Sequence, residues 1–353
     1  MFESIQGQDD AVKQMNSALK NPVNTYVFYG SRGTYVEESA RLFASRLLNN
    51  DGSCDQRVAS RVHPDAIEYE PSGITYRIKE DVRESMLDEL RKSPVEGKNK
   101  ALIVHDAHLL RDDSANAMLK SLEEPPENFY WILIAPNVDS LISTIRSRSF
   151  SITFSRLSEQ LIAKKLVEEG INTERATLVA SMAGGRLDRA RKLAGHYWPI
   201  RELATEIVNE TKFSASTVTN SSSKILGAFE EITSDVAAEN KTKLEEVKAN
   251  LKDSGYADKI VQSIITSHKK NIEAQEKKLK SELINELLDA LEYEYSIAAT
   301  KATSSGDEKK AAFCVNACEQ IEASRKRLVF NPSEALFIES LFASIVNMSL
   351  VNS

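Results

Sequence analysis

Residues 30–37 have the layout of a phosphate-binding loop but lack the side chains that carry out its chemistry. A working loop reads G-x-x-x-x-G-K-[ST], in which glycine lets the backbone curl around phosphate, lysine reaches the terminal phosphates and a hydroxyl holds Mg²⁺. The last three places here hold Tyr35, Val36 and Glu37. Tyrosine fills the space of the phosphates, valine has no charge, and glutamate is an anion where an anion would bind. We therefore expect an ATPase-shaped domain that does not hydrolyse ATP.

Gly30 and Gly33 alone would suit any tight connection between a strand and a helix, so the surroundings decide. Residues 26–29 predict a short buried strand before the loop, and residues 38–48 have the apolar spacing of a helix after it. This strand, loop and helix order is the context that a phosphate loop requires. Because the two glycines keep part of the backbone cradle, the sequence leaves open whether nucleotide still binds.

A second place for chemistry lies at residues 101–107, which read ALIVHDA. An apolar strand that ends in an acid presents an aspartate to Mg²⁺ in phosphate-loop ATPases, and Asp106 has that position. In a working enzyme the next residue is a glutamate that polarises the attacking water, whereas here it is Ala107. The chain thus lacks two independent parts of the hydrolytic chemistry.

The elements around these residues predict an α/β domain with a mostly parallel sheet, followed by an all-helical remainder. Ser158 is expected to cap the first helix of that remainder. Polar interruptions are expected at 214–223 and 303–306, and residues 241–280 are predicted to form a long solvated helical hairpin. Strands are predicted at 26–29, 66–69, 101–105, 131–135 and 151–154, and helices at 80–91, 114–122, 174–183 and 188–194.

Composition sets broad limits on function. The chain has 353 residues, with 41% hydrophobic and 27% charged, which suits two or three ordinary domains of a soluble protein. A net charge of -7 argues against a general nucleic-acid coat protein. No signal-like N-terminus and no apolar run of about eighteen residues occurs, which predicts a cytoplasmic protein without a membrane segment. Three cysteines are too few for a disulfide scaffold.

Two further segments carry a family resemblance. Residues 116–126 read NAMLKSLEEPP and residues 144–149 read TIRSRS, and both closely resemble segments of bacterial clamp-loader AAA+ proteins. Residues 63–65, His-Pro-Asp, lie where that family has the same triplet. The resemblance is strong over about the first two hundred residues. It is strongest to the branch with a broken phosphate loop, the delta-prime subunits of DNA polymerase III.

The resemblance implies a role for Arg148. In this family the arginine of the second segment reaches across a subunit interface to the ATP of a neighbouring gamma/tau subunit. A guanidinium supplied in trans stabilises the charge that develops on the γ-phosphate. A simpler reading, in which Arg148 pairs with a carboxylate on its own surface, stays open. Arg146 is the weaker candidate, and Ser149 replaces the family's cysteine.

The resemblance also exposes two departures. The family's four-cysteine zinc module is reduced to Cys54, so no zinc is expected. No functional ATP site is expected either, because of the altered loop and Ala107. In the lid, where active relatives have a nucleotide-sensing arginine, the alignment places Asp188. A shift of register would bring Arg186 or Arg189 there instead.

Together these observations imply a three-domain clamp-loader subunit. The expected parts are a degenerate AAA+ core at 1–156, a helical lid at 157–203 and a helical collar for oligomerisation at 204–353. Implied partners are gamma/tau and delta subunits, the sliding clamp and primed DNA, with this chain as a non-hydrolysing stator. Two alternatives stay open: an active gamma/tau-like ATPase, and an AAA+ relic that serves as a protein-interaction scaffold.

Overall fold

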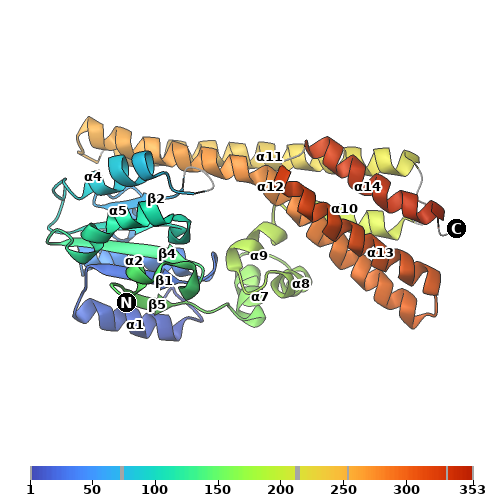
Figure 1. Ribbon diagram of the computed structural model, residues 1–353, viewed down its shortest axis with the longest axis horizontal. Coiled ribbons are helices and arrows are strands. Elements are labelled where there is room, and N and C mark those ends of the chain that lie inside the picture. Colours follow the sequence, from blue (N-terminus) through green and yellow to red (C-terminus); the bar gives the residue numbers. More distant parts are fainter. Residues whose placement is uncertain (1, 72–74, 211–214, 253, 331–332, 352–353) are drawn as a thin grey trace. The chain divides into compact units, whose positions relative to one another are not determined.

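A computed structural model describes residues 2–71, 75–210, 215–252, 254–330 and 333–351 (Figure 1). The chain forms two compact units. The first contains Met1–Arg191 together with Lys243–Ala274, and the second contains Lys192–Thr242 together with Gln275–Ser353. The expected three-domain borders at 156 and 203 stay a prediction. Within the described residues, no helix combines the length and the apolar character that crossing a membrane requires.

The first unit is built on a five-stranded sheet in the order β2-β3-β4-β1-β5, and every strand pair in it is parallel. The predicted strands are confirmed, with ends that shift by at most two residues. The strands are β1 (Thr25–Tyr29), β2 (Ala66–Tyr69), β3 (Lys100–Val104), β4 (Phe129–Ala135) and β5 (Phe150–Thr153).

The central strands are buried on both faces, which explains why they read as continuous apolar runs. In β1, Tyr26 and Phe28 belong to one apolar cluster, while Val27 and Tyr29 belong to the other. This alternation follows from the two-residue period of a strand. Helices α1 (Asp9–Lys20) and α2 (Val36–Leu48) cover the first face, and α5 (Asp112–Glu123) covers the second.

The other helices that begin within Met1–Arg191 are short (Figure 1). The predicted helix at 80–91 is corrected: the segment Ile78–Met86 is a π-helix, and only α4 (Leu87–Glu89) follows in α geometry. Its buried residues are Val82 and Met86, which are four positions apart. The other helices are α3 (Asp55–Ala59), α6 (Ser143–Arg146), α7 (Glu159–Glu168), α8 (Thr173–Met182) and α9 (Leu187–Ala194), whose last residues lie in the second unit.

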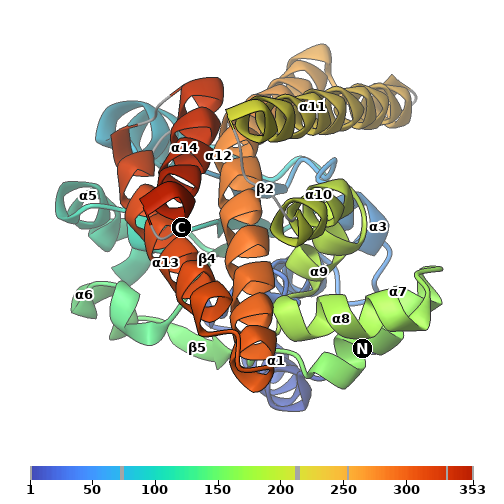
Figure 2. The ribbon, with the colours of Figure 1, turned by 90° about the vertical axis from the view of Figure 1, so that its right-hand side faces the viewer.

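The all-helical remainder begins as predicted. The Ser158 side chain accepts a hydrogen bond from the backbone N–H of Leu161 and caps α7. The second unit contains α10 (Trp198–Asn209), α13 (Glu308–Arg325), α14 (Glu334–Val351) and most of α11 (Ala215–Lys252) and α12 (Asp258–Ser304). Helices α13 and α14 pack against each other (Figure 2).

One predicted interruption is wrong and the other is confirmed. Ser214 lies outside the described residues, but from Ala215 onward the segment to 223 is helical. Buried Ile225, Phe229 and Ile232 form an apolar stripe in the same helix, so packing outweighs the weak helix propensity of serine and threonine. The break at 303–306 is real, because α12 ends at Ser304 and Gly306 has a left-handed φ of 78°.

The hairpin predicted at 241–280 is also confirmed as helical, but it is not solvated all round. Its tip, Lys243–Ala274, belongs to the first unit, where Val247 and Leu251 pack against Val62. The ring nitrogen Nε2 of His268 lies 3.1 Å from the carbonyl oxygen of Arg61. The apolar stripe therefore has a partner within the sheet-containing unit.

Polar contacts reinforce this docking. Arg57 Nη1 lies 2.5 Å from both the Tyr256 hydroxyl and Glu96 Oε1, and the Tyr256 hydroxyl also donates to Glu96. Burial is the main reason that the pKa of Tyr256 rises to about 12, so this hydroxyl stays protonated and can donate. The hairpin tip is thus held by an apolar contact and by an ion-paired hydrogen-bond group.

Substituting Leu251 by alanine is expected to loosen this docking. Leu251 is 2% exposed, and deleting a buried leucine side chain in a small cluster costs about 2 kcal/mol. Amide hydrogen exchange should accelerate across residues 57–62, and the urea midpoint of the first unit should fall. The exposed neighbour Lys252, changed to alanine, is the matched control. Equal exchange in the two variants would contradict the docking.

Candidate functional site

The degenerate loop lies at the carboxyl end of β1, between β4 and β5. The Gly30 N–H donates to the Ala135 carbonyl at 3.0 Å, and a Cβ on Gly30 would come within 2.8 Å of Phe154 Cβ. Gly33 has a left-handed φ of 73°, which glycine adopts without strain. The close approach of Phe154 and the left-handed turn therefore favour glycine at both positions.

Tyr35 occupies the place of the second glycine, and its own backbone is left-handed. Its φ is 68° and its ψ is 8°, a left-handed geometry that costs a residue with a side chain about 1 kcal/mol. The ring is half-buried against the first apolar cluster, and burial raises the pKa of its hydroxyl. Val36, the next residue, is fully buried in the same cluster. Neither side chain can provide the cation that the missing lysine would supply.

Glu37 completes the altered end of the loop. Its carboxylate accepts a hydrogen bond from the Gly33 N–H at 3.4 Å, and its side chain is 17% exposed. Burial raises the pKa of this carboxyl, and His105 and Arg32 oppose the rise. A carboxylate thus takes up a backbone N–H of the cradle that a phosphate oxygen would need.

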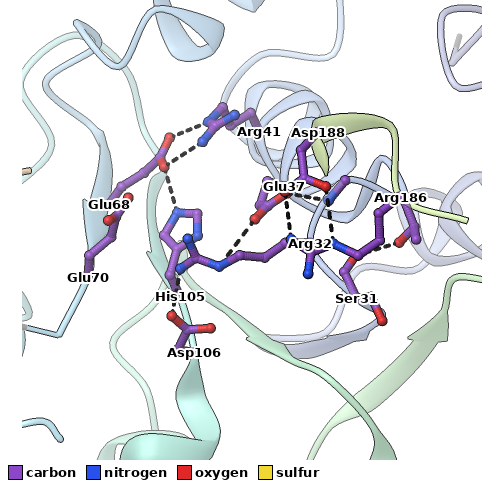
Figure 3. A network of polar contacts seen from close by, with 12 residues as sticks. Ser31, Arg32, Glu37, Arg41, Glu68, Glu70, His105, Asp106, Arg186 and Asp188 are labelled. Carbon is purple, nitrogen blue, oxygen red and sulfur yellow. Dashed lines mark hydrogen bonds and ion pairs between the residues drawn. The ribbon is translucent and has the colours of Figure 1, made fainter. Parts of the chain in front are cut away.

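Arg32, which the sequence analysis did not single out, bridges the loop to the end of β3. Its Nη2 lies 2.6 Å from Asp106 Oδ2 and its Nε lies 3.8 Å from Glu37 Oε1 (Figure 3). Asp106 has a left-handed φ of 47°, and Ala107 after it is fully buried. The acid at the position that faces Mg²⁺ in working P-loop ATPases therefore contacts an arginine of its own chain.

Behind this pair lies a buried ion network centred on Glu68, in β2. The Glu68 carboxylate lies 2.8 Å from Arg41 Nε and 2.7 Å from His105 Nε2 (Figure 3). Arg61 Nε lies 3.0 Å from the same carboxylate. Glu70 adds a 2.9 Å contact to Arg61. Burial alone would raise the pKa of the Glu68 carboxyl, but Arg41, the hydrogen bond from His105 and Arg61 hold it far below its usual range. This network ties β2, β3 and α2 together beneath the loop.

The lid segment closes directly on the loop. The Leu187 N–H donates to the Gly33 carbonyl at 2.8 Å, and a Cβ on Gly33 would lie only 1.9 Å from Asp188 Oδ1. Asp188 is thus the lid residue against the loop, and it also pairs with Arg186 at 2.8 Å. Of the two alternatives for the sensor position, Arg186 lines the cavity beside the loop, and Arg189 is not among its lining residues.

The remaining space at the loop is small. Gly30, Ser31, Arg32, Glu37 and the end of β3 line, with Arg186, a cavity of about 220 Å³. Pockets that take drug-sized ligands usually have about 300–1,000 Å³. The cavity is below this range, and its walls carry carboxylates as well as arginines.

Arg148 lies just after α6, on the surface of the first unit. Its Nη2 lies 2.6 Å from Glu123 Oε1, its Nη1 donates to the Thr144 carbonyl at 3.0 Å, and its side chain is 37% exposed. The simpler reading, a pair within its own surface, thus describes the single chain. Arg146 makes a longer pair, 3.5 Å to Asp139, which is almost fully exposed.

Cys54, the remnant of the expected zinc module, is buried beside Ser45. Its Sγ lies 3.2 Å from Ser45 Oγ, and the neighbouring Asp55 pairs with Arg46 at 2.6 Å. Within the described ranges, no group of three or more His, Cys, Asp or Glu side chains is arranged to hold a metal ion. Cys54 and Val58 also belong to the first apolar cluster, so apolar packing holds this segment together with a hydrogen bond and an ion pair.

A parallel sheet with a phosphate-type loop after β1, an acid after β3 and a helical lid defines an AAA+-type P-loop domain. Residues 7–158 match the model of the family described as DNA polymerase III, delta subunit. Subunit delta' of DNA polymerase III from Bacillus subtilis is 29% identical over 176 residues, which is 47% of this chain and 53% of that protein. Over these residues the chain is similar to subunits of DNA polymerase III.

The chain is also similar to proteins named gamma and tau subunits of DNA polymerase III. DNA polymerase III subunit gamma from Buchnera aphidicola (subspecies Acyrthosiphon pisum) is 30% identical over 212 residues, 55% of this chain and 58% of that protein. The solved structure of a gamma subunit-related protein from Thermotoga maritima aligns with a TM-score of 0.43 and 20% identity, over 96% of this chain and 99% of that one. The chain thus spans little more than half the length of the first two curated relatives.

Proposed function

We propose that this chain is a non-hydrolysing subunit of a DNA polymerase III clamp loader, of the delta-prime kind. It would act in the cytoplasm as a stator beside gamma/tau and delta subunits, while the sliding clamp is loaded onto primed DNA. The observation that carries the proposal is the contact of Arg32 with Asp106, because it occupies the acid that would otherwise face Mg²⁺. No zinc and no bound ATP are proposed for it.

The altered loop supports this proposal independently. Tyr35, Val36 and Glu37 replace the glycine, lysine and hydroxyl residue of a working loop, and Ala107 replaces the water-polarising glutamate. Each loss alone would cripple hydrolysis, because phosphoryl transfer depends on positioning and on charge stabilisation together. The cavity of about 220 Å³ leaves little room for a nucleotide.

A trans role for Arg148 is proposed with it. The side chain is 37% exposed, and its guanidinium contacts only groups at the same surface, Glu123 and Thr144 among them. A planar guanidinium at a subunit edge suits a phosphate of a neighbour better than a lysine would. The finger would serve the ATP bound by a gamma/tau subunit.

The second candidate is a gamma/tau-like ATPase, because proteins named gamma and tau are similar to this chain at 28–32% identity. Its two carboxylates, Glu37 and Asp106, would then have to part from Arg32 when nucleotide binds. The structure supports the first candidate better, since this second one needs a rearranged loop. A scaffold without a replication role is the third reading.

Two assays on the whole chain separate these functions. A fluorescent ATP analogue with Mg²⁺ is expected to show no binding to the isolated chain. Adding the chain to gamma/tau, delta, clamp and primed DNA is expected to stimulate both ATP hydrolysis and clamp loading. Binding and hydrolysis by the isolated chain would favour the gamma/tau reading. An assembly that works equally well without the chain would favour the scaffold.

A further inference from the structure

Arg32, a residue of the loop, lies beside the carboxylates of Asp106 and Glu37. Arg32 contacts Asp106 at 2.6 Å and Glu37 at 3.8 Å, and their side chains are 21% and 17% exposed. Burial lowers the pKa of Arg32, but Asp106, Glu37 and Glu70 together raise it above its usual value. The guanidinium is thus permanently charged and lies among groups that need a cation.

The same residues do not fit a nucleotide with Mg²⁺. The acid after β3 faces the metal ion in working P-loop ATPases, and here its oxygen is taken by Arg32. Glu37 stands where a hydroxyl would hold Mg²⁺ and occupies the Gly33 N–H instead. Arginine has no acceptor atom, so it cannot join a shared metal ion and can only replace it.

Residues Leu187 and Asp188, at the start of α9, also contact the loop. Leu187 N–H donates to the Gly33 carbonyl at 2.8 Å, and Asp188 packs so closely that Gly33 has no room for a Cβ. In P-loop proteins, contacts from loop and acid normally converge on the bound ligand. Here loop, acid and lid make their contacts with one another directly.

We propose that Arg32 is a built-in cation that takes the place of the divalent metal ion between the loop and the end of β3. It holds Glu37 and Asp106 together and so keeps the site closed without nucleotide. The inference rests on the proposed loss of ATP hydrolysis, and it adds that Arg32 takes the position of the metal ion. Removing the guanidinium is therefore expected to leave a pair of carboxylates that recruits a divalent cation.

The test uses the full chain with Mn²⁺ alone as the probe, because Mn²⁺ prefers oxygen ligands and its free ion is counted by electron paramagnetic resonance. Arg32→Ala is expected to lower Tm by about 4 °C and to bind Mn²⁺, which raises Tm again. Arg32→Lys keeps a charge and is expected to bind no Mn²⁺. The double variant Arg32→Ala with Asp106→Asn is expected to lose the Mn²⁺ response.

Three results would overturn the proposal: a folded Arg32→Ala chain that binds no Mn²⁺, a double variant that binds it as tightly as the single one, or Mn²⁺ binding by the unmodified chain. If Arg32→Ala does not fold in metal-free buffer, Mn²⁺ must restore its folding, and failure to do so also overturns the proposal. The clamp-loader role is tested separately, by ATP hydrolysis and clamp loading in the reconstituted assembly. Failure of the Mn²⁺ experiment would therefore overturn the role of Arg32 but not the clamp-loader role.

Discussion

Replacing Arg148 by alanine is expected to slow ATP hydrolysis by about 10³-fold at the gamma/tau site that this chain is proposed to complete. The side chain contacts Glu123 and the Thr144 carbonyl, so removing it deletes exposed contacts rather than core packing. Surface pairs of this kind contribute about 0–1 kcal/mol to stability, and the chain should therefore still fold and assemble. Single-turnover hydrolysis and clamp loading by the reconstituted assembly are the measurements.

Matched variants separate a finger from a structural role. Arg146→Ala removes a neighbouring cation on the same surface and is expected to leave hydrolysis within about threefold, since its partner Asp139 is almost fully exposed. Arg148→Lys keeps the charge but loses the planar fork, and is expected to stay strongly impaired. Normal hydrolysis with Arg148→Ala in a complete assembly would refute the trans role.

Replacing Glu68 by glutamine is expected to lower the free energy of unfolding of the first unit by about 3 kcal/mol at neutral pH. Glu68 is buried and is the shared counter-charge of Arg41 and Arg61. Glutamine keeps the shape but removes the charge, which leaves Arg41 without an anion of its own, while Arg61 retains Glu70. Breaking a buried ion pair is costly because the remaining charge stays desolvated.

The loss is expected to depend on pH in a defined direction. The pKa of Glu68 in the folded state is far below its unfolded value of about 4.3, so its stabilisation is fully present above that pH and is lost as the pH falls. The difference between the native chain and Glu68→Gln should therefore be constant from about pH 5 to 7 and shrink in stronger acid. A gap that widens in acid would contradict the network.

Tryptophan fluorescence can report the unfolding of the first unit alone. The chain has two tryptophans, and Trp131 is fully buried in β4. A Trp198→Phe background leaves Trp131 as the reporter of the sheet in urea titrations. The exposed Glu127, changed to glutamine, serves as the control and is expected to change stability by less than about 0.5 kcal/mol.

Most of the first unit was predictable from the sequence because its strands are buried on both faces. Continuous apolar runs such as 101–104 predict strands in the middle of the sheet, and Gly30 with Gly33 indicates the loop. The loss of phosphate-binding side chains could also be predicted from the sequence, because Tyr35, Val36 and Glu37 each lack the group that a working loop needs at that position.

The remainder could not be read because it depends on long-range pairing. Nothing near Glu68 in the sequence indicates that Arg41 and His105 converge on it from α2 and the end of β3. Arg32 looked like an ordinary loop residue until the fold brought Asp106, 74 positions away, to its guanidinium. The sequence does show a cation, Arg32, in a loop that also contains the acid Glu37. Without the order of the strands, however, it does not show that Asp106 lies beside them.

The docked hairpin tip has a consequence for the order in which the chain becomes protected during synthesis. Arg57 and Tyr256 are 199 residues apart, so the segment around Val62 leaves the ribosome long before its covering helices exist. At bacterial and eukaryotic elongation rates of about 5–20 residues per second, this delay is about 10–40 s. During that interval Val62 lacks the hairpin side chains that cover it in the folded chain, so this part of the first unit completes its packing only late in synthesis.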